Sequence, residues 1–361
     1  MIGTMTEEVR SRVGGREDLA DLPTYRAPQL EARVRLNTNE SPYPPPSSFL
    51  ESLFTRIGEA ELNRYPDRDA NEVRERLAAH LGTITERVWA ASGSNEILLQ
   101  VLLAFGGFER KVMTFEPTYG MHSHIARIAG TRLLRGRRDS DFSIQPDLTV
   151  EAIRAELPDI VFLCSPNNPT GNSDPLETVA QICSAAPGIV VMDQAYAEFS
   201  DTTFHHLVEE FEHLIVVRSF SKAWRLAGVR IGYLIAQRGI IEEIGRVRLP
   251  YHFSTLAQAA ALAALDHSDE LLGTAETIKH ERDRVWRELS TTKDIVAFPS
   301  DANFIMFRPQ KPAGEVWQSL LDREVLIRDF SDRRGSEGCL RVTIGSPEEN
   351  EAFLEALAES L

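Results

Sequence analysis

The sequence predicts an α/β fold, in which a large domain holds a mostly parallel sheet between helices and a smaller α+β domain follows. Short apolar runs rich in β-branched residues recur along the first two-thirds of the chain, and such runs are typical of strands buried on both faces. Polar loops and helical patterns separate these runs, which is the βαβ rhythm of a parallel sheet. The clearest runs span residues 111–115, 160–164, 189–192 and 214–217.

The chain length predicts two lobes, because 361 residues exceed what one small hydrophobic core needs. The pattern changes after residues 250–254, where an alanine-rich helix, a long helix from Ser268 to about Leu289 and several short strands follow. We therefore predict an N-terminal arm with part of the small domain at residues 1–45, a large ligand-binding domain at residues 46–258, and a small C-terminal domain at residues 259–361.

The composition is that of an ordinary globular protein, with 42% hydrophobic and 26% charged residues. The net charge of −15 argues against a nucleic-acid partner and an anionic membrane surface, so any anion site must be a local basic pocket. The cysteines Cys164, Cys183 and Cys339 have neither the count nor the spacing of a disulfide framework or a metal site. No signal-like run opens the chain, and no apolar stretch reaches the roughly 18 residues of a membrane helix. We therefore expect a cytoplasmic protein with no metal and no membrane partner.

A lysine with small hydroxyl neighbours follows the apolar run at residues 214–217, in the order Ser219, Ser221, Lys222, with Arg230 a little further on. A lysine amine at the end of a buried strand can form a Schiff base with a carbonyl, including the aldehyde of pyridoxal phosphate (PLP). The serine hydroxyls and the planar fork of the arginine can hold the phosphate of the same cofactor. Taken alone, such a lysine is more often part of a solvated turn.

Other polar residues follow neighbouring strands and supply the remaining groups that PLP chemistry needs. Asp193 can face the ring nitrogen and keep it protonated, which makes the ring an electron sink. Asn168 and Tyr196 can donate to the ring oxygen, and Tyr119 can stack on the ring. The turn at residues 93–95 leads directly into a helix, whose first backbone N–H groups favour an anion.

The ordered set of motifs from about Arg33 to the C-terminus resembles the fold-type-I PLP-dependent aminotransferases and, among them, the histidinol-phosphate aminotransferase group. The matching segments are residues 37–43, 64–67, 93–96, 165–171, 193–196, 219–222, 226–233, 325–330 and 338–345. The resemblance implies the fold-type-I architecture, PLP as cofactor, transamination between histidinol phosphate and 2-oxoglutarate in histidine biosynthesis, and a homodimer with shared active sites.

The resemblance also implies roles for individual residues. The catalytic residues would be Lys222, which binds the cofactor aldehyde, Asp193 and Tyr196. The cofactor-binding residues would be Tyr65 from the neighbouring subunit, Gly93, Ser94, Asn95, Tyr119, Asn168, Asp193, Tyr196, Ser219, Ser221, Lys222 and Arg230. The substrate-binding residues would be Tyr43 and Arg328 for the phosphate, Arg341 for the carboxylate of the amino donor, and Asn168.

The chain departs from the family pattern at four places and by an extra N-terminal stretch, and the changes at Trp224-Arg225 and His252-Phe253 leave the substrate open. Asn95 replaces an aspartate, Gln194 a glutamate, Trp224-Arg225 an aromatic-glycine pair, and His252-Phe253 an asparagine-led pair beside the predicted substrate pocket. The alternatives are an aromatic amino acid aminotransferase or another specialised aminotransferase, a PLP-dependent amino-acid-phosphate decarboxylase, and a non-catalytic PLP-binding regulator. The regulator would need a basic DNA-binding module, for which the first 30 residues are too short and too mixed in charge.

Overall fold

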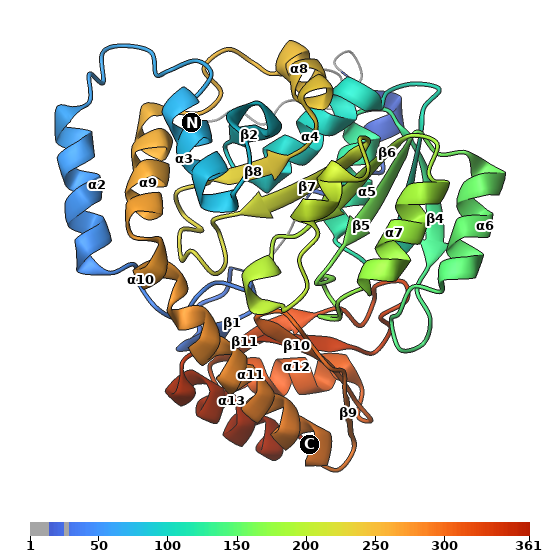
Figure 1. Cartoon of the computed structure of the whole chain (residues 1–361). Coiled ribbons are helices and arrows are strands. Elements are labelled where there is room, and N and C mark those ends of the chain that lie inside the picture. Colours follow the sequence, from blue (N-terminus) through green and yellow to red (C-terminus); the bar gives the residue numbers. More distant parts are fainter. Residues whose placement is uncertain (1–13, 25–28) are drawn as a thin grey trace.

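A computed structural model describes residues 14–24 and 29–361 of the chain and contains two sheets flanked by helices (Figure 1). The larger sheet has seven strands, and β8 pairs antiparallel with both of its neighbours while the other pairs are parallel. Its strands, in spatial order, are β2 (Val88–Ala91), β8 (Gly232–Ile235), β7 (Leu214–Ser219), β6 (Ile189–Asp193), β5 (Ile160–Cys164), β3 (Lys111–Glu116) and β4 (Arg132–Arg137).

The central strands of this sheet are buried on both faces because alternate side chains enter two different hydrophobic cores. On β5, for example, Val161 and Leu163 belong to one core while Ile160 and Phe162 belong to the other. The helices of this part of the chain are α2 (Ser47–Glu59), α3 (Asn71–Leu81), α4 (Ser94–Phe105), α5 (Gly120–Ile128), α6 (Pro146–Glu156), α7 (Leu176–Ala185), α8 (Arg238–Val247) and α9 (Thr255–Asp266). Short 3₁₀ turns occur at η1 (Glu17–Leu19), η2 (Thr85–Arg87), η3 (Ala197–Phe199) and η4 (His205–Glu209).

The second sheet has five strands and lies below the large sheet in the view of Figure 1. Its strands, in spatial order, are β1 (Val34–Leu36), β11 (Val325–Asp329), β12 (Leu340–Thr343), β10 (Phe304–Pro309) and β9 (Ile295–Ala297). Its helices are α10 (Ser268–Leu272), α11 (Thr274–Thr291), α12 (Ala313–Asp322) and α13 (Pro347–Ser360). The N-terminal strand β1 pairs parallel with β11, so the chain joins this sheet before it enters the larger one.

The α/β fold class is confirmed, and the four apolar runs all form strands of the large sheet. The single long helix predicted from Ser268 to about Leu289 is wrong, because Gly273 separates α10 from α11. Glycine is a poor helix former, and this one ends the short helix α10.

The predicted domain boundaries stay predictions, and part of the predicted N-terminal arm, residues 1–13 and 25–28, lies outside the described residues. Within the described ranges no helix is long and apolar enough to cross a membrane.

Candidate active site

Asp193 ends strand β6 and is held in one orientation inside the protein. One carboxylate oxygen, Oδ1, accepts the backbone N–H of Ala195 at 3.1 Å, and the other, Oδ2, lies 3.1 Å from Nε2 of His122. His122 comes from α5, is fully buried and stacks on Phe162 with ring centroids 4.6 Å apart. The sequence analysis missed His122, since only the folded helix brings it to the end of β6.

Tyr196 and Asn168 meet at the same edge of the sheet. The Tyr196 hydroxyl accepts hydrogen bonds from Nδ2 of Asn168 at 3.1 Å and from Nδ2 of Asn39 at 2.9 Å. Oδ1 of Asn168 accepts a hydrogen bond from Nη1 of Arg341 at 2.6 Å. Burial raises the pKa of the Tyr196 phenol, so its hydroxyl stays protonated at neutral pH. Asn39 is a second residue to which the sequence analysis assigned no role.

Lys222 follows strand β7 and places its amine beside this cluster. The amine donates a hydrogen bond to the backbone carbonyl of Thr38 at 3.0 Å and lies 5.9 Å from the ring centroid of Tyr196. Burial lowers the pKa of Lys222 to about 8, and the positive charges of Arg341 and Arg230 act in the same direction. About a tenth of the amine is therefore neutral at pH 7, far more than for an ordinary lysine, and the neutral amine is the form that attacks a carbonyl.

The N-terminus of α4 and Arg230 form a cup of hydrogen-bond donors. A Cβ atom on Gly93, which has a φ of +94°, would lie only 2.7 Å from Nη2 of Arg230, so glycine lets the guanidinium approach the start of the helix. Nη1 of Arg230 donates to the Ser221 hydroxyl at 3.0 Å, and the Ser219 hydroxyl accepts the backbone N–H of Ser221 at 3.1 Å. A cation beside the positive end of a helix suits a phosphate.

Tyr119 lies between this cup and the Asp193 region. Its hydroxyl donates a hydrogen bond to Oδ1 of Asn95 at 3.2 Å, and its ring meets His122 edge to face at 5.5 Å. Asn95, which departs from the usual aspartate, thus takes an acceptor role that an aspartate would also fill.

Arg328 and Arg341 face each other across the β11–β12 ladder, where they are directly paired residues. Their guanidinium carbons lie 6.0 Å and 5.1 Å from the ring centroid of Phe330, so one aromatic ring has both cations near it. Like charges opposite each other on neighbouring strands repel, and an anionic ligand between them would relieve that repulsion. The pair therefore forms a candidate site for an anion.

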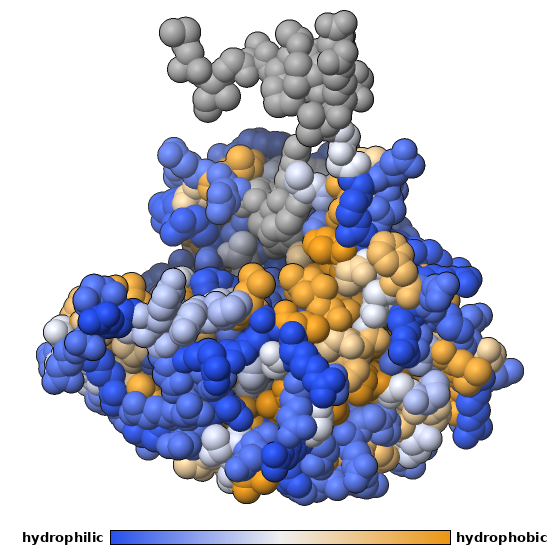
Figure 2. Space-filling model, turned by 90° about the horizontal axis from the view of Figure 1, so that it is seen from above, coloured by the Kyte–Doolittle hydropathy of each residue, from blue (hydrophilic) through white to orange (hydrophobic). Residues whose placement is uncertain are grey.

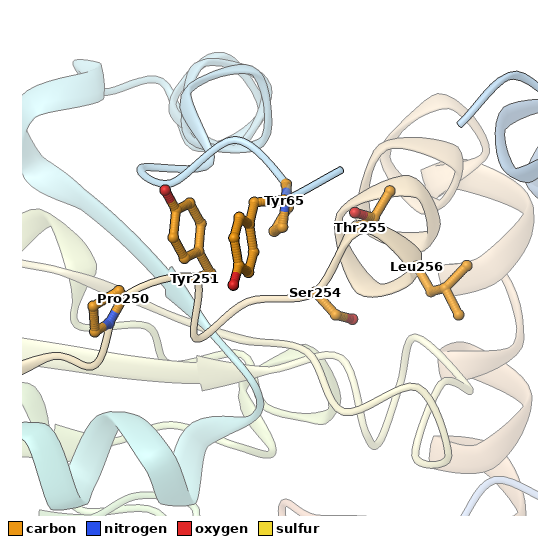
Figure 3. A pocket seen from close by; sticks show the side chains of 7 residues that line it. Tyr65, Pro250, Tyr251, Ser254, Thr255 and Leu256 are labelled. Carbon is orange, nitrogen blue, oxygen red and sulfur yellow. The ribbon is translucent and has the colours of Figure 1, made fainter. Parts of the chain in front are cut away.

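Two predicted site residues lie apart from these clusters. Tyr65 is 78% exposed and stacks on Tyr251, with ring centroids 4.2 Å apart, beside an open pocket that reaches the start of α9 (Figure 3). Tyr43 is half-buried against the core of the smaller sheet. Burial and the nearby carboxylates, first that of Glu281, raise the pKa of the Tyr43 phenol. The cation of Arg225, which donates to the neighbouring Pro44 carbonyl, acts on this pKa in the opposite direction, and the predicted role of Tyr43 stays a prediction.

The residues that depart from the family pattern beside the predicted substrate pocket are mostly buried inside the protein. The His252 ring stacks on Trp89 at 5.4 Å, and its Nε2 lies 3.1 Å from the backbone carbonyl of Ala90. Phe253 is buried in the core of the large sheet. Trp224 is also buried, and it stacks on Phe220 at 4.2 Å.

Residues 32–357 match the family described as aminotransferase class I and II. The chain belongs to the class I and II aminotransferase family. It is 47% identical to a histidinol-phosphate aminotransferase of Frankia casuarinae, with 96% of this chain and 90% of that protein covered. It is 46% identical to one of Corynebacterium glutamicum, with 98% of each chain covered. A crystal structure of histidinol-phosphate aminotransferase from Sinorhizobium meliloti in complex with PLP is similar in fold, with a TM-score of 0.87, 25% identity, and coverage of 95% of this chain and 96% of that one.

This aminotransferase uses PLP, and the residues present fit that cofactor. The donor cup at Gly93 and Arg230 suits the phosphate, the buried amine of Lys222 suits the aldehyde, and the fixed carboxylate of Asp193 suits the ring nitrogen. When bound, PLP supplies a ring that takes up the electron pair released at the substrate carbon. The individual roles of the site residues stay predictions. Within the described residues, no group of three or more His, Cys, Asp or Glu side chains could hold a metal ion.

Proposed function

We propose that this aminotransferase transfers the amino group of histidinol phosphate to 2-oxoglutarate. The observation that carries the proposal is the direct pairing of Arg328 with Arg341 across β11 and β12. Two neighbouring guanidinium groups suit a set of substrates in which one partner has a phosphate and the other has two carboxylates. The relatives named histidinol-phosphate aminotransferase, at 46–47% identity over nearly the whole chain, support the same assignment.

Each of the two arginines has its own part in this proposal. Arg341 would bind the carboxylate shared by glutamate and 2-oxoglutarate, since its Nη1 already orients Asn168 within the cofactor cluster. Arg328 lies one strand further out and would bind the phosphate of histidinol phosphate. Nζ of Lys222 would carry the proton between substrate and cofactor carbons, because its lowered pKa lets the amine accept a proton near neutral pH.

The deciding experiment compares kcat/KM for histidinol phosphate with kcat/KM for phenylalanine, with 2-oxoglutarate as the acceptor in both cases. We expect a clear preference for histidinol phosphate, because phenylalanine offers no phosphate to Arg328. A clear preference for phenylalanine would assign the chain to aromatic amino acid transamination instead. Release of carbon dioxide from an amino-acid phosphate, with no oxo-acid product, would assign it to decarboxylation.

The proposal includes a homodimer in the cytoplasm with active sites shared between subunits. The face of the molecule seen from above in Figure 2 carries an extended group of hydrophobic residues. Three large hydrophobic side chains near Tyr65 are also exposed. Leu62 is close to Tyr65 in the sequence, and Tyr251 and Leu256 line the same pocket as Tyr65. Burying such residues favours association, and a second subunit would give the exposed Tyr65 a cofactor phosphate to reach.

Mixed dimers test this assembly. Lys222→Ala and Tyr65→Ala each damage one component of a shared site, so a heterodimer of the two variants should contain one intact site and regain activity. If the two inactive homodimers regain no activity on mixing, this result would argue against active sites that are shared between subunits. An active monomer in light scattering would rule out the obligate dimer.

A further inference from the structure

Asn39 lies in the segment that leaves strand β1, and it is 1% exposed. Its backbone has a φ of +56°, which is the left-handed region that asparagine tolerates better than most residues. Its backbone carbonyl accepts a hydrogen bond from Nδ2 of Asn303 at 3.2 Å, which ties the segment to the smaller sheet. The protein therefore holds this side chain firmly, in a conformation that most residues would avoid.

The short segment around Asn39 contacts three residues of the candidate site. The carbonyl of Asn37 accepts Nη2 of Arg341 at 2.9 Å, and the carbonyl of Thr38 accepts the Lys222 amine at 3.0 Å. Nδ2 of Asn39 donates to the Tyr196 hydroxyl at 2.9 Å. One end of β1 thus supports groups from both sheets.

The amide of Asn168 is oriented by Arg341. A guanidinium only donates hydrogen bonds, so the atom of Asn168 that faces Nη1 of Arg341 at 2.6 Å must be the oxygen Oδ1. The amide nitrogen of Asn168 therefore faces the Tyr196 hydroxyl, 3.1 Å away.

The amide of Asn39 is oriented by Thr343. The Thr343 hydroxyl oxygen accepts the backbone N–H of Asn39 at 3.0 Å, and its proton is donated to Oδ1 of Asn39 at 3.1 Å. The Asn39 nitrogen therefore also faces Tyr196. The phenol oxygen receives two amide donors, and its own proton must point to a third direction.

We infer that Asn39 is a positioning residue that, together with Asn168, directs the hydroxyl proton of Tyr196 toward the ring oxygen of bound PLP. With both protein neighbours donating, neither can accept the proton of Tyr196. The inference rests on the aminotransferase assignment and on the role predicted for Tyr196, and it does not depend on which amine is the substrate. Asn39 acts only through Tyr196 and is not itself a catalytic residue.

The test follows the absorbance of the lysine-bound cofactor as a function of pH, without substrate. A hydrogen-bond donor to the ring oxygen stabilises the negative charge of that oxygen and so lowers the pKa of the lysine-bound cofactor, which is the chromophore that the absorbance follows. Asn39→Gly removes the amide while allowing the φ of +56°. We expect this variant to raise the chromophore pKa by about half a unit to one unit, and Tyr196→Phe to raise it further. In the Tyr196→Phe background, Asn39→Gly should cause no additional shift.

Two further variants complete the design. Asn350→Ala removes another buried asparagine, which bonds Gly345 and Glu281 outside the site, and should leave the chromophore pKa unchanged. Thr343→Val removes the hydroxyl that orients Asn39, and should raise the pKa in the same direction by a smaller amount. Thr343→Val decides the question if Asn39→Gly fails to fold.

An unchanged chromophore pKa in Asn39→Gly, or in Thr343→Val where the first variant does not fold, would overturn the inference. The inference would also be overturned if Asn39→Gly shifted the chromophore pKa equally in the wild-type and Tyr196→Phe backgrounds, because Asn39 would then not act through the Tyr196 hydroxyl. A preference for phenylalanine as substrate would alter the proposed function but would leave this titration unaffected.

Discussion

The two ends of the candidate site are built in different ways. At the cofactor end, Asp193 and Lys222 each follow one strand of the seven-stranded sheet, and the apolar runs of those strands are visible in the sequence. At the substrate end, Arg328 and Arg341 come from paired strands of the other sheet. Distant segments meet at the cofactor end as well, since Asn39, which follows β1, donates to Tyr196, 157 positions away in the chain. The principal groups of the cofactor end each follow one strand, whereas the two arginines of the substrate end depend on the pairing of two strands.

This difference suggests how the two ends respond to substitution. A residue at the cofactor end carries out a distinct chemical task, so its loss should affect every substrate alike. A residue at the substrate end recognises one chemical group, so its loss should change the ratio between substrates. Since Arg341 contacts Asn168 and also contributes to the low pKa of Lys222, it belongs to both ends.

The largest effect is expected from Lys222→Ala. This variant loses the amine that is predicted to attach the cofactor and move the proton, so transamination should be abolished for every amino donor. Borohydride reduction of the wild-type enzyme followed by peptide mapping should place the label on Lys222. Label on a different lysine would contradict the assignment, and Lys279→Ala, which removes a lysine paired with Glu276 at 2.9 Å, serves as the active control.

Asp193→Asn should weaken both cofactor binding and turnover. Loss of a charge-assisted hydrogen bond to the ring nitrogen costs about 1.5–3 kcal/mol, or roughly ten- to a hundredfold in affinity for PLP. Affinity is measured by titrating the cofactor-free enzyme. His122→Phe keeps a ring against Phe162 but removes the contact to Asp193, and should have a smaller effect in the same direction. Unchanged PLP affinity together with unchanged turnover in Asp193→Asn would exclude the role.

The sequence was most informative where one buried strand ends in a functional residue. The run Ile160–Cys164 and the run that begins at Ile189 are continuous apolar segments, and their positions fixed those of Asn168 and Asp193 along the sheet edge. Strand β4 (Arg132–Arg137) was not predicted, because it is an edge strand with no buried residue and no apolar run.

The contacts of His122 and Asn39 could not be predicted, because they join segments that are distant in the sequence. Asn39 lies within a matched motif, yet only the folded chain shows that its amide reaches Tyr196. In the same way, the sequence places Arg328 and Arg341 on two strands, but their register sets them directly opposite each other. The roles of all of these residues stay predictions until they are tested by substitution.

Arg328→Ala should reduce kcat/KM for histidinol phosphate by about ten- to a hundredfold, since a charged hydrogen-bonded contact contributes about 1.5–3 kcal/mol. The loss should appear mainly as a higher KM for histidinol phosphate, and kcat/KM for glutamate should depend more on Arg341. Arg308→Ala is a matched control, because Arg308 lies on strand β10 of the same sheet, beyond β12, with its guanidinium 5.6 Å from the ring of Phe298. Equal losses for histidinol phosphate and glutamate in Arg328→Ala would contradict a specific phosphate contact.

The rate at which cofactor-free enzyme captures PLP should rise with pH through the pKa of Lys222, which is about 8. Below that pH the amine is mostly protonated and has no lone pair for the aldehyde, so capture one unit below the pKa should be about tenfold slower than on the plateau above it. Arg341→Met removes a charge that lowers this pKa and should move the profile to higher pH. A profile that does not move would show that Arg341 does not influence the cofactor end.

The smallest effect is expected from His252→Asn, although this position departs from the family pattern beside the predicted pocket. The His252 ring stacks on Trp89, and its Nε2 lies 3.1 Å from the Ala90 carbonyl, so its contacts lie along strand β2 and do not involve the paired arginines. We expect the ratio of kcat/KM for histidinol phosphate and phenylalanine to change by less than about threefold, while loss of the stacked ring lowers stability by about 0.5–1.5 kcal/mol. Thermal melting and the two-substrate assay measure both quantities on one preparation. A change in this kcat/KM ratio as large as that in Arg328→Ala would contradict the expectation. It would indicate that His252 contributes to the substrate pocket of the second subunit in the proposed dimer, so that specificity depends on the subunit interface as well as on the arginine pair.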